Sequence, residues 1–163
     1  MITVGILTMS DKGSRGERED LSGKEIERML KNLPAEVKAY EIIPDEADII
    51  RSKLIEFVDR KKLDLILTTG GTGVSPRDVT PEATRAVIEK ELPGMSEAMR
   101  AESLKKTPNA MISRAICGIR KQSLIINLPG SPRAVRENLA VVLPAIHHAV
   151  EKIKGSQEEC GTA

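Results

Sequence analysis

The sequence predicts a single α/β domain whose sheet is mainly parallel. The chain has 163 residues, which suits one domain and allows it to bury a hydrophobic core. Strand-like apolar runs alternate with segments of helical periodicity, and this alternation is typical of right-handed βαβ units. Because no change in composition marks a second domain, we expect one domain over residues 1–154 and a polar tail over residues 155–163.

Composition argues against several classes of function. Hydrophobic residues make up 40% of the chain and charged residues 30%, as in globular proteins. A net charge of +1 and an aromatic content of 1% argue against a nucleic-acid binder. The chain does not open with a secretory signal, and no apolar run approaches the roughly 18 residues of a membrane span. Cys117 and Cys160 are predicted to be unpaired thiols. We therefore expect a cytoplasmic protein that binds neither nucleic acid nor membranes.

The first half of the chain predicts two strands and two helices. Ile2 to Met9 is apolar almost throughout, as in a strand buried on both faces. After the charged loop Asp11 to Asp20, a helix is predicted from apolar residues at helical spacing, which are Ile26, Met29, Leu30 and Leu33. Val37 to Ile43 is the second strand. Pro44 and Asp45 then mark the entry to a helix with the predicted buried stripe Ile49, Ile50, Leu54, Phe57 and Val58.

A third strand and two more helices are predicted next. Leu63 to Leu67 reads as a short strand that runs into a glycine-rich loop. Thr80 is the predicted N-cap of a helix with Pro81 at its first position, and the helix has the apolar face Ala83, Val87 and Ile88. Pro93-Gly94 ends that helix, and Met95 to Leu104 is predicted to be another.

The chain is predicted to finish with a buried strand and a long helix. Leu124 to Ile126 is the fourth strand, and Leu128 to Pro132 follows it as a loop. The helix has an apolar side made of Val135, Leu139, Val142, Ile146, Val150 and Ile153. Pro144 removes one hydrogen bond inside this helix and is expected to bend it.

Four loops are expected to share one crevice. In parallel α/β sheets, ligands lie beyond the carboxyl ends of the strands. The loops that follow the predicted strands are Ser10 to Arg15, Pro44 to Glu46, Thr69 to Asp78 and Leu128 to Arg133. The sequence therefore predicts that residues far apart in the chain form one binding site at this edge of the sheet.

The two glycine loops are candidates for binding a phosphate. Thr68 to Gly73 contains three glycines in four positions, so backbone N–H groups can turn towards an anion, with hydroxyl donors from Thr69 and Thr72. The positive end of the helix near Thr80 is expected to point at the same space. A tight turn with positive φ explains the glycines equally well. Leu128 to Pro132 is explained mostly by helix capping, yet two such loops together favour a cleft for a phosphorylated ligand.

Three carboxylates are predicted to lie in the same crevice. Asp11, Asp45 and Asp78 each follow a strand or belong to its loop, and each alone would be explained as a helix cap or a loop-stabilising acid. Together they would repel phosphates unless a hard cation such as Mg²⁺ lies between them. A nucleotide–Mg²⁺ site is the simplest interpretation. Arg77 is the candidate cation because it lies inside the glycine-rich loop.

Read together, these segments resemble the molybdopterin adenylyltransferase family of molybdenum cofactor biosynthesis, which includes the bacterial enzyme and the matching domains of the plant enzyme and of gephyrin. The resemblance covers nearly the whole chain, and the order and spacing of the segments make it specific. The matching segments are Leu7 to Asp11, Pro44 to Glu46, Gly70 to Gly73, Pro76 to Ala83, Pro93 to Met95, Ser113-Arg114, Gly118 to Arg120 and Ile126 to Pro132. The charged loop Gly13 to Glu19 has no clear counterpart in the family.

The resemblance implies a three-layer αβα fold of the molybdopterin-binding type, commonly assembled as a homotrimer. It implies an enzyme that joins the AMP moiety of Mg-ATP to the terminal phosphate of molybdopterin and releases pyrophosphate. ATP would be the co-substrate, Mg²⁺ the cofactor, and a molybdenum-insertion protein the recipient of the product. By position in the motifs, Asp45 and Asp78 match the family's essential aspartates, and we expect both to hold the Mg²⁺. The expected substrate-binding residues are Ser10, Asp11, Thr69, Gly70, Gly71, Thr72, Gly73, Arg77, Pro129, Gly130 and Ser131.

Two other functions remain open from the sequence. A protein of the same fold could hold molybdopterin or anchor a partner without turnover, and only the enzyme would release pyrophosphate from ATP in a Mg²⁺-dependent way. A generic flavodoxin-like nucleotide-binding domain would explain the glycine loops but would leave Asp45, Asp78 and the second proline–glycine loop unexplained. Whether the substrate belongs to a molybdenum or a tungsten pathway also stays open.

Overall fold

The computed structural model describes residues 1–157 and contains one six-stranded sheet in the order β2-β1-β3-β6-β5-β4. In that order the strands are β2 (Ala35–Ile43), β1 (Ile2–Met9), β3 (Leu65–Thr69), β6 (Ser123–Leu128), β5 (Cys117–Arg120) and β4 (Lys90–Glu91). The first four are parallel to one another, whereas β5 pairs antiparallel with β6, and β4 at the edge pairs antiparallel with β5. The predicted α/β fold with a mainly parallel sheet is confirmed. Cys160 and most of the predicted tail lie outside the described residues.

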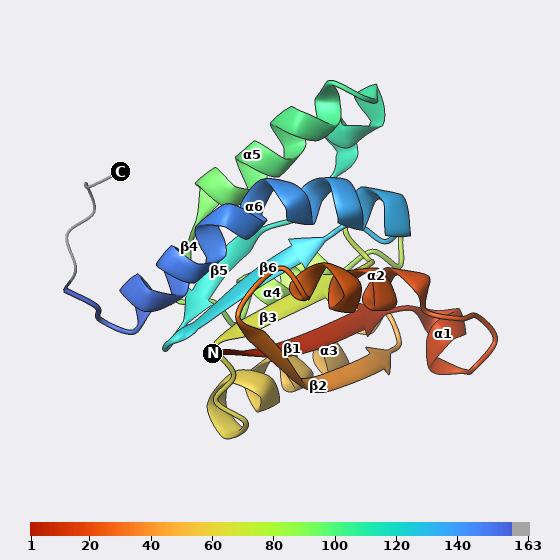
Figure 1. Ribbon diagram of the computed structural model, residues 1–163. Helices are drawn as coiled ribbons and strands as arrows, with labels where there is room; N and C mark the ends of the chain where they lie inside the picture. Colours follow the sequence, from red (N-terminus) through yellow and green to blue (C-terminus); the bar gives the residue numbers. More distant parts are fainter. Residues whose placement is uncertain (158–163) are drawn as a thin grey trace.

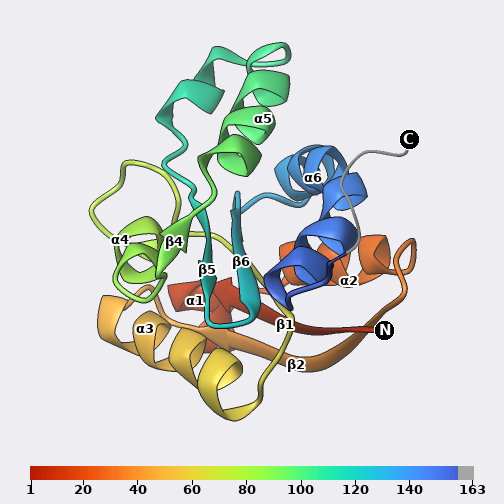
Figure 2. The same ribbon diagram turned by 90° about the vertical axis from the view of Figure 1, so that its left-hand side faces the viewer.

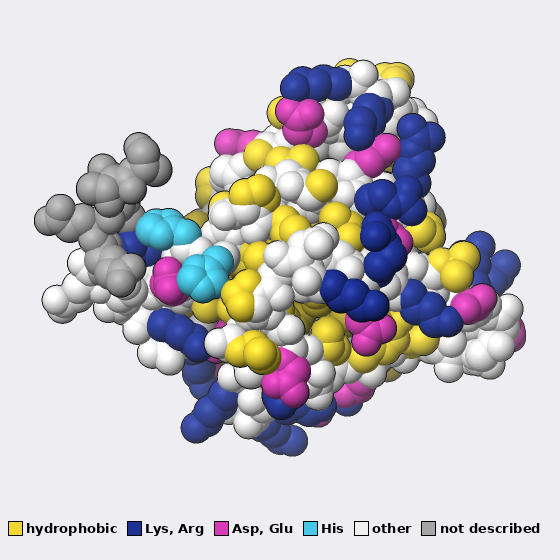
Figure 3. All heavy atoms as spheres, viewed as in Figure 1, with side chains coloured by type: hydrophobic (Ala, Val, Ile, Leu, Met, Phe, Trp, Pro, Cys, Tyr) yellow, Lys and Arg dark blue, Asp and Glu magenta, His cyan; other side chains and the backbone are white. Residues whose placement is uncertain are grey.

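Helices cover both faces of the sheet (Figures 1 and 2). On one face, α2 (Leu21–Leu30), α5 (Pro93–Leu104) and α6 (Pro132–Ile153) pack on a core that includes Ile26, Met99 and Leu139. On the other face, α3 (Ala47–Ile55), its π-helical continuation η1 (Glu56–Arg60) and α4 (Thr80–Arg85) pack on a second core. The first face carries Lys and Arg side chains along the side where α6 and α2 begin (Figure 3). The predicted three-layer αβα architecture is therefore confirmed.

The antiparallel edge of the sheet was not predicted. β4 contains only two residues and β5 only four, so neither has a long apolar run that would mark it in the sequence. The turn from β5 to β6 uses Lys121 with φ 51°, where a glycine or asparagine would have signalled a hairpin. A short 3₁₀ helix, η2 (Pro108–Ile112), precedes β5 and was likewise not predicted.

Three local predictions need correction. Val79, and not Thr80, is the N-cap of α4, because the Thr80 hydroxyl donates to the carbonyl oxygen of Gly70 at 2.9 Å. Ile49 was expected to be buried but is 39% exposed, since the helix presents Ile50 and Leu54 to the core instead. Leu33 lies beyond the end of α2, although it still packs against the core.

Two other features of the chain bear on its chemistry. Cys117 is a free, buried cysteine, and burial raises the pKa of its thiol to about 12, so it is not a candidate nucleophile. The predicted strand-to-helix loop at Ser131 is confirmed as an N-cap, because the Ser131 hydroxyl accepts from the N–H of Ala134 at 3.1 Å. α6 then continues through Pro144 to Ile153. Over residues 1–157, none of the helices combines the length and hydropathy that crossing a bilayer requires.

The middle of β1 requires a residue without a side chain. A Cβ atom at Gly5 would lie 2.6 Å from Phe57 Cδ2 and 2.8 Å from Leu63 Cδ1, and both of these side chains are buried. We expect Gly5→Ala to lower the free energy of unfolding by roughly 1–3 kcal/mol, measured by urea denaturation. Gly94→Ala is the control: its Cβ would meet nothing within 4 Å, and it lies in α5, where alanine is favoured. Equal stability of the two variants would contradict this account.

Candidate functional site

A pocket of about 620 Å³ lies at the carboxyl end of the parallel strands. Its walls come from the loops after all four of these strands, namely Ser10 to Gly13 after β1, Asp45 after β2, Gly70-Gly71 with Asp78 after β3, and Gly130 to Pro132 after β6. Thr8 and Met9 at the end of β1 also line the pocket. The segment Arg18 to Ser22, which leads into α2, completes the wall. The predicted crevice is therefore present, and all four predicted loops contribute to it.

The predicted site residues divide into two groups. Those that line the pocket are Ser10, Asp11, Asp45, Gly70, Gly71, Asp78, Gly130 and Ser131. The others, Thr69, Thr72, Gly73, Arg77 and Pro129, are not part of its lining.

The residues behind the wall hold the loops in place. The Thr69 hydroxyl donates to the Pro129 carbonyl at 2.6 Å and so joins the two glycine loops. The guanidinium of Arg114 donates to the carbonyl oxygens of Gly73 at 2.7 Å and Asp78 at 2.8 Å, while its backbone N–H donates to the Thr72 carbonyl at 2.8 Å. Arg114 is a cation near the predicted loops, but it was not chosen as a site residue because it lies outside the glycine-rich loop.

The first glycine loop needs its glycines for backbone geometry. Gly70 has φ 94° and Gly71 has φ 67°, a region that residues with a side chain rarely adopt. A Cβ on Gly70 would collide with the carbonyl oxygen of Met9, so the close approach of β1 also requires glycine. The tight-turn interpretation is therefore correct, and it leaves the anion-binding interpretation intact. The N–H groups of Gly71, Thr72 and Gly73 donate to no acceptor within residues 1–157.

The two helices near the pocket contribute differently. α4 has only six residues, and its first N–H group, on Thr80, already donates to the Gly71 carbonyl at 3.1 Å. The predicted contribution of this helix end to anion binding is therefore not supported. α6 has 22 residues and begins at Pro132, which lines the pocket, so its positive end faces the site.

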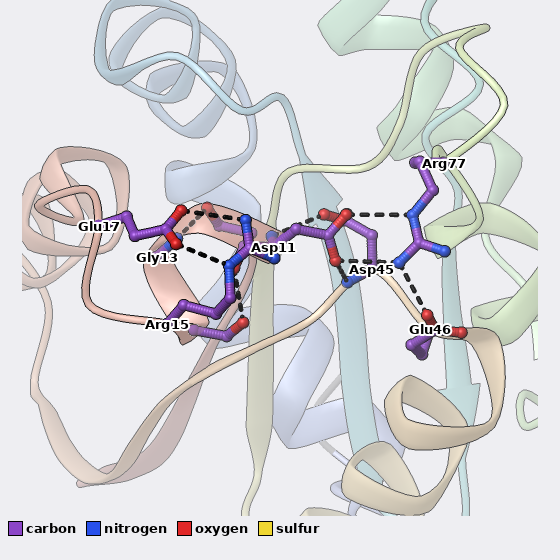
Figure 4. A network of polar contacts seen from close by, with 9 residues as sticks. Asp11, Gly13, Arg15, Glu17, Asp45, Glu46 and Arg77 are labelled. Carbon is purple, nitrogen blue, oxygen red and sulfur yellow. Dashed lines mark hydrogen bonds and ion pairs between the residues drawn. The ribbon is translucent and has the colours of Figure 1, made fainter.

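Asp11 and Asp45 bind one another's backbone (Figure 4). The N–H of Asp11 donates to Asp45 Oδ2 at 3.1 Å, and the N–H of Asp45 donates to Asp11 Oδ1 at 3.0 Å. Burial raises the pKa of Asp45 above its ordinary value, and the negative charges of Asp11 and Asp78 raise it further, although the Asp11 N–H opposes this. Asp45 is thus a half-buried carboxyl group in an environment that disfavours its negative charge.

Arg77 links three loops from outside the pocket. Its guanidinium donates to both Asp11 carboxylate oxygens, at 3.1 and 3.0 Å, and to Glu46 Oε1 at 2.8 Å (Figure 4). The hydrogen bonds from Arg77 and then from the Asp45 N–H hold the pKa of Asp11 below its ordinary value. Two carboxylates therefore engage the charge of Arg77, the candidate cation, and its side chain does not line the pocket.

Asp20 also lines the pocket, although it was not among the residues predicted for the site. Its carboxylate accepts hydrogen bonds from the hydroxyls of Thr8 at 2.7 Å, Ser22 at 3.1 Å and Tyr40, and from the Gly23 N–H at 2.9 Å. Burial alone would raise the pKa of Asp20, but the hydrogen bonds from Tyr40, Gly23, Thr8 and Ser22 outweigh it and lower the pKa. An aspartate directly before a helical stripe is a helix-cap signal, and Asp20 is indeed the N-cap of α2.

Asp45 and Asp78 fit a metal ion that is shared with a ligand. Within residues 1–157, no three His, Cys, Asp or Glu side chains form a group that would hold a metal without other ligands. In both aspartates, Oδ2 accepts one backbone N–H, from Asp11 at 3.1 Å and from Ser75 at 3.0 Å, and Oδ1 accepts none from the described residues. Mg²⁺ commonly takes one or two protein carboxylates and completes its shell with waters and phosphate oxygens. The pair suits this kind of site.

The pocket is polar and lies at the carboxyl edge of the parallel sheet. The loop amides of Gly71 to Gly73 donate to no acceptor within residues 1–157, and the carboxylates of Asp45 and Asp78 are half-buried. These features define a small-molecule site for an anionic ligand. The sequence profile of a family described as "Probable molybdopterin binding domain" matches residues 5–148. The chain belongs to this family.

Curated and solved relatives agree with this assignment. The chain is 50% identical over 158 residues to the molybdopterin adenylyltransferase of Helicobacter pylori strain J99, covering 95% of this chain and 89% of the relative. The structure of the molybdopterin biosynthesis enzyme MoaB from Thermus thermophilus matches with TM-score 0.91 and 52% identity over 96% of this chain and 98% of that one. The tungsten cofactor synthesizing protein MoaB of Pyrococcus furiosus matches with TM-score 0.86 and 34% identity over 94% and 98%.

Proposed function

We propose that this protein is a molybdopterin adenylyltransferase, which joins AMP from Mg-ATP to the terminal phosphate of molybdopterin. A relative that is 50% identical over 95% of the chain carries this name. The structural observation that carries the proposal is that Asp45 and Asp78 line one pocket together with both glycine loops. A shared pocket of about 620 Å³ suits two small substrates that must react with one another.

The proposed reaction needs positioning more than it needs a strong base. An oxygen of the pterin's terminal phosphate attacks the α-phosphorus of ATP, the bond to the bridging oxygen breaks, and pyrophosphate leaves with the electron pair. A phosphate monoester is already ionised at neutral pH, so no residue has to remove a proton first. The main barrier is the repulsion between two anions, which the amides of Gly71 to Gly73 and the beginning of α6 would reduce.

The role proposed for Asp45 and Asp78 is to hold Mg²⁺ on the triphosphate. When bound, the ion would supply positive charge to the phosphate oxygens and orient the leaving group. The carboxylates would keep their negative charge, because protons are not transferred by them in this scheme. Their Oδ1 atoms, which accept no hydrogen bond from residues 1–157, and the negative charges of Asp11 and Asp78 beside Asp45 support this role.

The proposal is tested by incubating the purified protein with molybdopterin, ATP and Mg²⁺. We expect adenylylated pterin and pyrophosphate in equal amounts, and we expect chelation of the metal with EDTA to lower the rate roughly 100-fold or more. Restoring Mg²⁺ should restore the rate. If the protein binds molybdopterin but releases no pyrophosphate, the alternative function, pterin binding without turnover, is correct.

Other parts of the proposal follow from the family resemblance. The homotrimer, the hand-off to a molybdenum-insertion protein and the cytoplasmic location remain expectations. The choice between a molybdenum and a tungsten pathway remains open, since relatives of both descriptions match the chain.

A further inference from the structure

The part of the pocket wall between β1 and α2 contains two cationic residues to which the proposed function gives no role. Lys12 and Arg18 both line the pocket, and both belong to the charged segment between β1 and α2, most of which has no counterpart in the family resemblance. Neither side chain forms a hydrogen bond or an ion pair with any residue of the described range 1–157. Lys12 lies near enough to Glu17 to lower the pKa of that carboxyl group slightly, after the larger effect of Arg15.

The other cations near the pocket are already paired. Arg15 binds Glu17 at 3.0 Å, and Arg77 binds Asp11 and Glu46. In α6, Arg133 pairs with Glu137 at 3.0 Å and Arg136 pairs with Glu25 at 2.9 Å. Lys12 and Arg18 can therefore bind an anionic ligand without breaking an ion pair within residues 1–157.

The acidic residues of the pocket make this charge necessary. The lining carboxylates are Asp11, Glu19, Asp20, Asp45 and Asp78. Arg77 offsets Asp11 and Lys24 offsets Glu19, which leaves Asp20, Asp45 and Asp78. One divalent ion on Asp45 and Asp78 would neutralise those two carboxylates, so it would leave no net positive charge to balance the phosphate groups of the substrates. Beside the amides of Gly71 to Gly73, further cations would help to bring two anionic substrates together, and the pocket lining provides Lys12 and Arg18.

We propose that Lys12 and Arg18 bind the terminal phosphate of the pterin substrate and set the preference for the phosphorylated form. This inference rests on the proposed function and adds a substrate-binding role for two residues. The ammonium and the guanidinium would form charge-assisted hydrogen bonds with a phosphate monoester dianion. Both side chains are exposed, so they can move to a ligand without breaking a hydrogen bond or an ion pair to residues 1–157.

The test uses binding of molybdopterin and of its dephosphorylated form, without ATP or Mg²⁺, to the full-length protein. We expect Lys12→Gln and Arg18→Gln each to raise the Kd for molybdopterin about tenfold. The Kd for the dephosphorylated pterin should stay within about twofold, and the double variant should lose most of the preference for the phosphorylated form. Arg18→Lys should retain most of the affinity because it keeps the charge.

Arg15→Gln is the matched control. It removes the same unit charge from the same loop, but Arg15 is paired with Glu17 and does not line the pocket. If it weakens binding as much as Arg18→Gln does, only the overall charge matters and the inference is wrong. Thermal melting checks that the exposed substitutions leave the fold unchanged.

Steady-state kinetics separate this inference from the proposed function. We expect the double variant to raise KM for molybdopterin and to leave KM for ATP and kcat within about twofold. A rise in KM for ATP instead would assign Lys12 and Arg18 to the triphosphate and overturn the inference. If the wild-type protein binds molybdopterin but never forms pyrophosphate, the proposed function fails, while the binding data still decide the role of these residues.

Discussion

Asp45→Asn is expected to lower the rate of adenylyl transfer roughly 100-fold or more, and at the same time to make the ligand-free protein more stable at neutral pH. The loss of activity follows because an amide oxygen is a much weaker ligand for Mg²⁺ than a carboxylate. The shape of the site should change little, since the Asn oxygen can still accept the Asp11 N–H that Asp45 Oδ2 accepts at 3.1 Å.

The gain in stability follows from the raised pKa of Asp45. Burial raises this pKa above the ordinary value of 3.8, with further effects from Asp11 and Asp78. A group whose pKa is higher in the folded than in the unfolded state contributes its stability below the unfolded pKa and loses it as the pH rises through the folded pKa. At pH 7, where the carboxyl group of the unfolded chain is ionised, the raised pKa of Asp45 therefore destabilises the ligand-free fold, and a neutral asparagine removes that penalty.

Calorimetry without ligand or metal checks this prediction. The melting temperature of Asp45→Asn should exceed that of the wild type at pH 7, and the difference should disappear as the pH falls below 3.8. Asp48→Asn is the control, because Asp48 is an exposed acid three residues away that pairs with Arg51, and it should leave activity unchanged. A variant that is inactive but less stable than the wild type at neutral pH would contradict the account of Asp45.

The sequence was sufficient for the part of the fold that surrounds the pocket. β1, β3 and β6 are buried on both faces, so they are nearly continuous apolar runs and were recognised as such. β4 and β5 are short and lie towards one edge of the sheet. The turn before β6 has Lys121 at a positive φ, and a lysine does not predict this conformation. Edge strands of this kind are defined by pairing with a neighbour, which a local pattern cannot reveal.

The position of the site could also be predicted, because parallel strands place their following loops at one edge of the sheet. The identity of the lining side chains could not be predicted with the same success. Arg77 was selected for its place in the sequence, but its charge is taken by Asp11 and Glu46. Asp20 was missed because it is fixed by Thr8 from β1 and Tyr40 from β2. Both outcomes depend on which side chains meet in space.

Gly71→Ala is expected to lower stability strongly and to lower activity as well, because the position combines two separate constraints. Its φ of 67° is strained for alanine, and the new Cβ would press on the Thr80 hydroxyl and lie 3.1 Å from Asp45 Oδ1. Thr80 is fully buried and binds the Gly70 carbonyl, so it cannot move away freely. We expect a loss of roughly 2–4 kcal/mol in the free energy of unfolding, measured in urea.

The effect of Gly71→Ala on activity should exceed what its loss of stability explains, because Asp45 is the neighbour that moves. Asp45 has to shift by a few tenths of an ångström. Since a displacement of about 1 Å in a positioning group lowers a rate roughly 100-fold, we expect a smaller but measurable further loss of rate. Gly16→Ala separates the two constraints: Gly16 has φ 74°, but a Cβ there would meet nothing within 4 Å. It should cost only the backbone strain of roughly 1 kcal/mol and keep its activity. If Gly16→Ala and Gly71→Ala have equal effects, crowding against Asp45 and Thr80 is unimportant, and the glycine serves the turn alone.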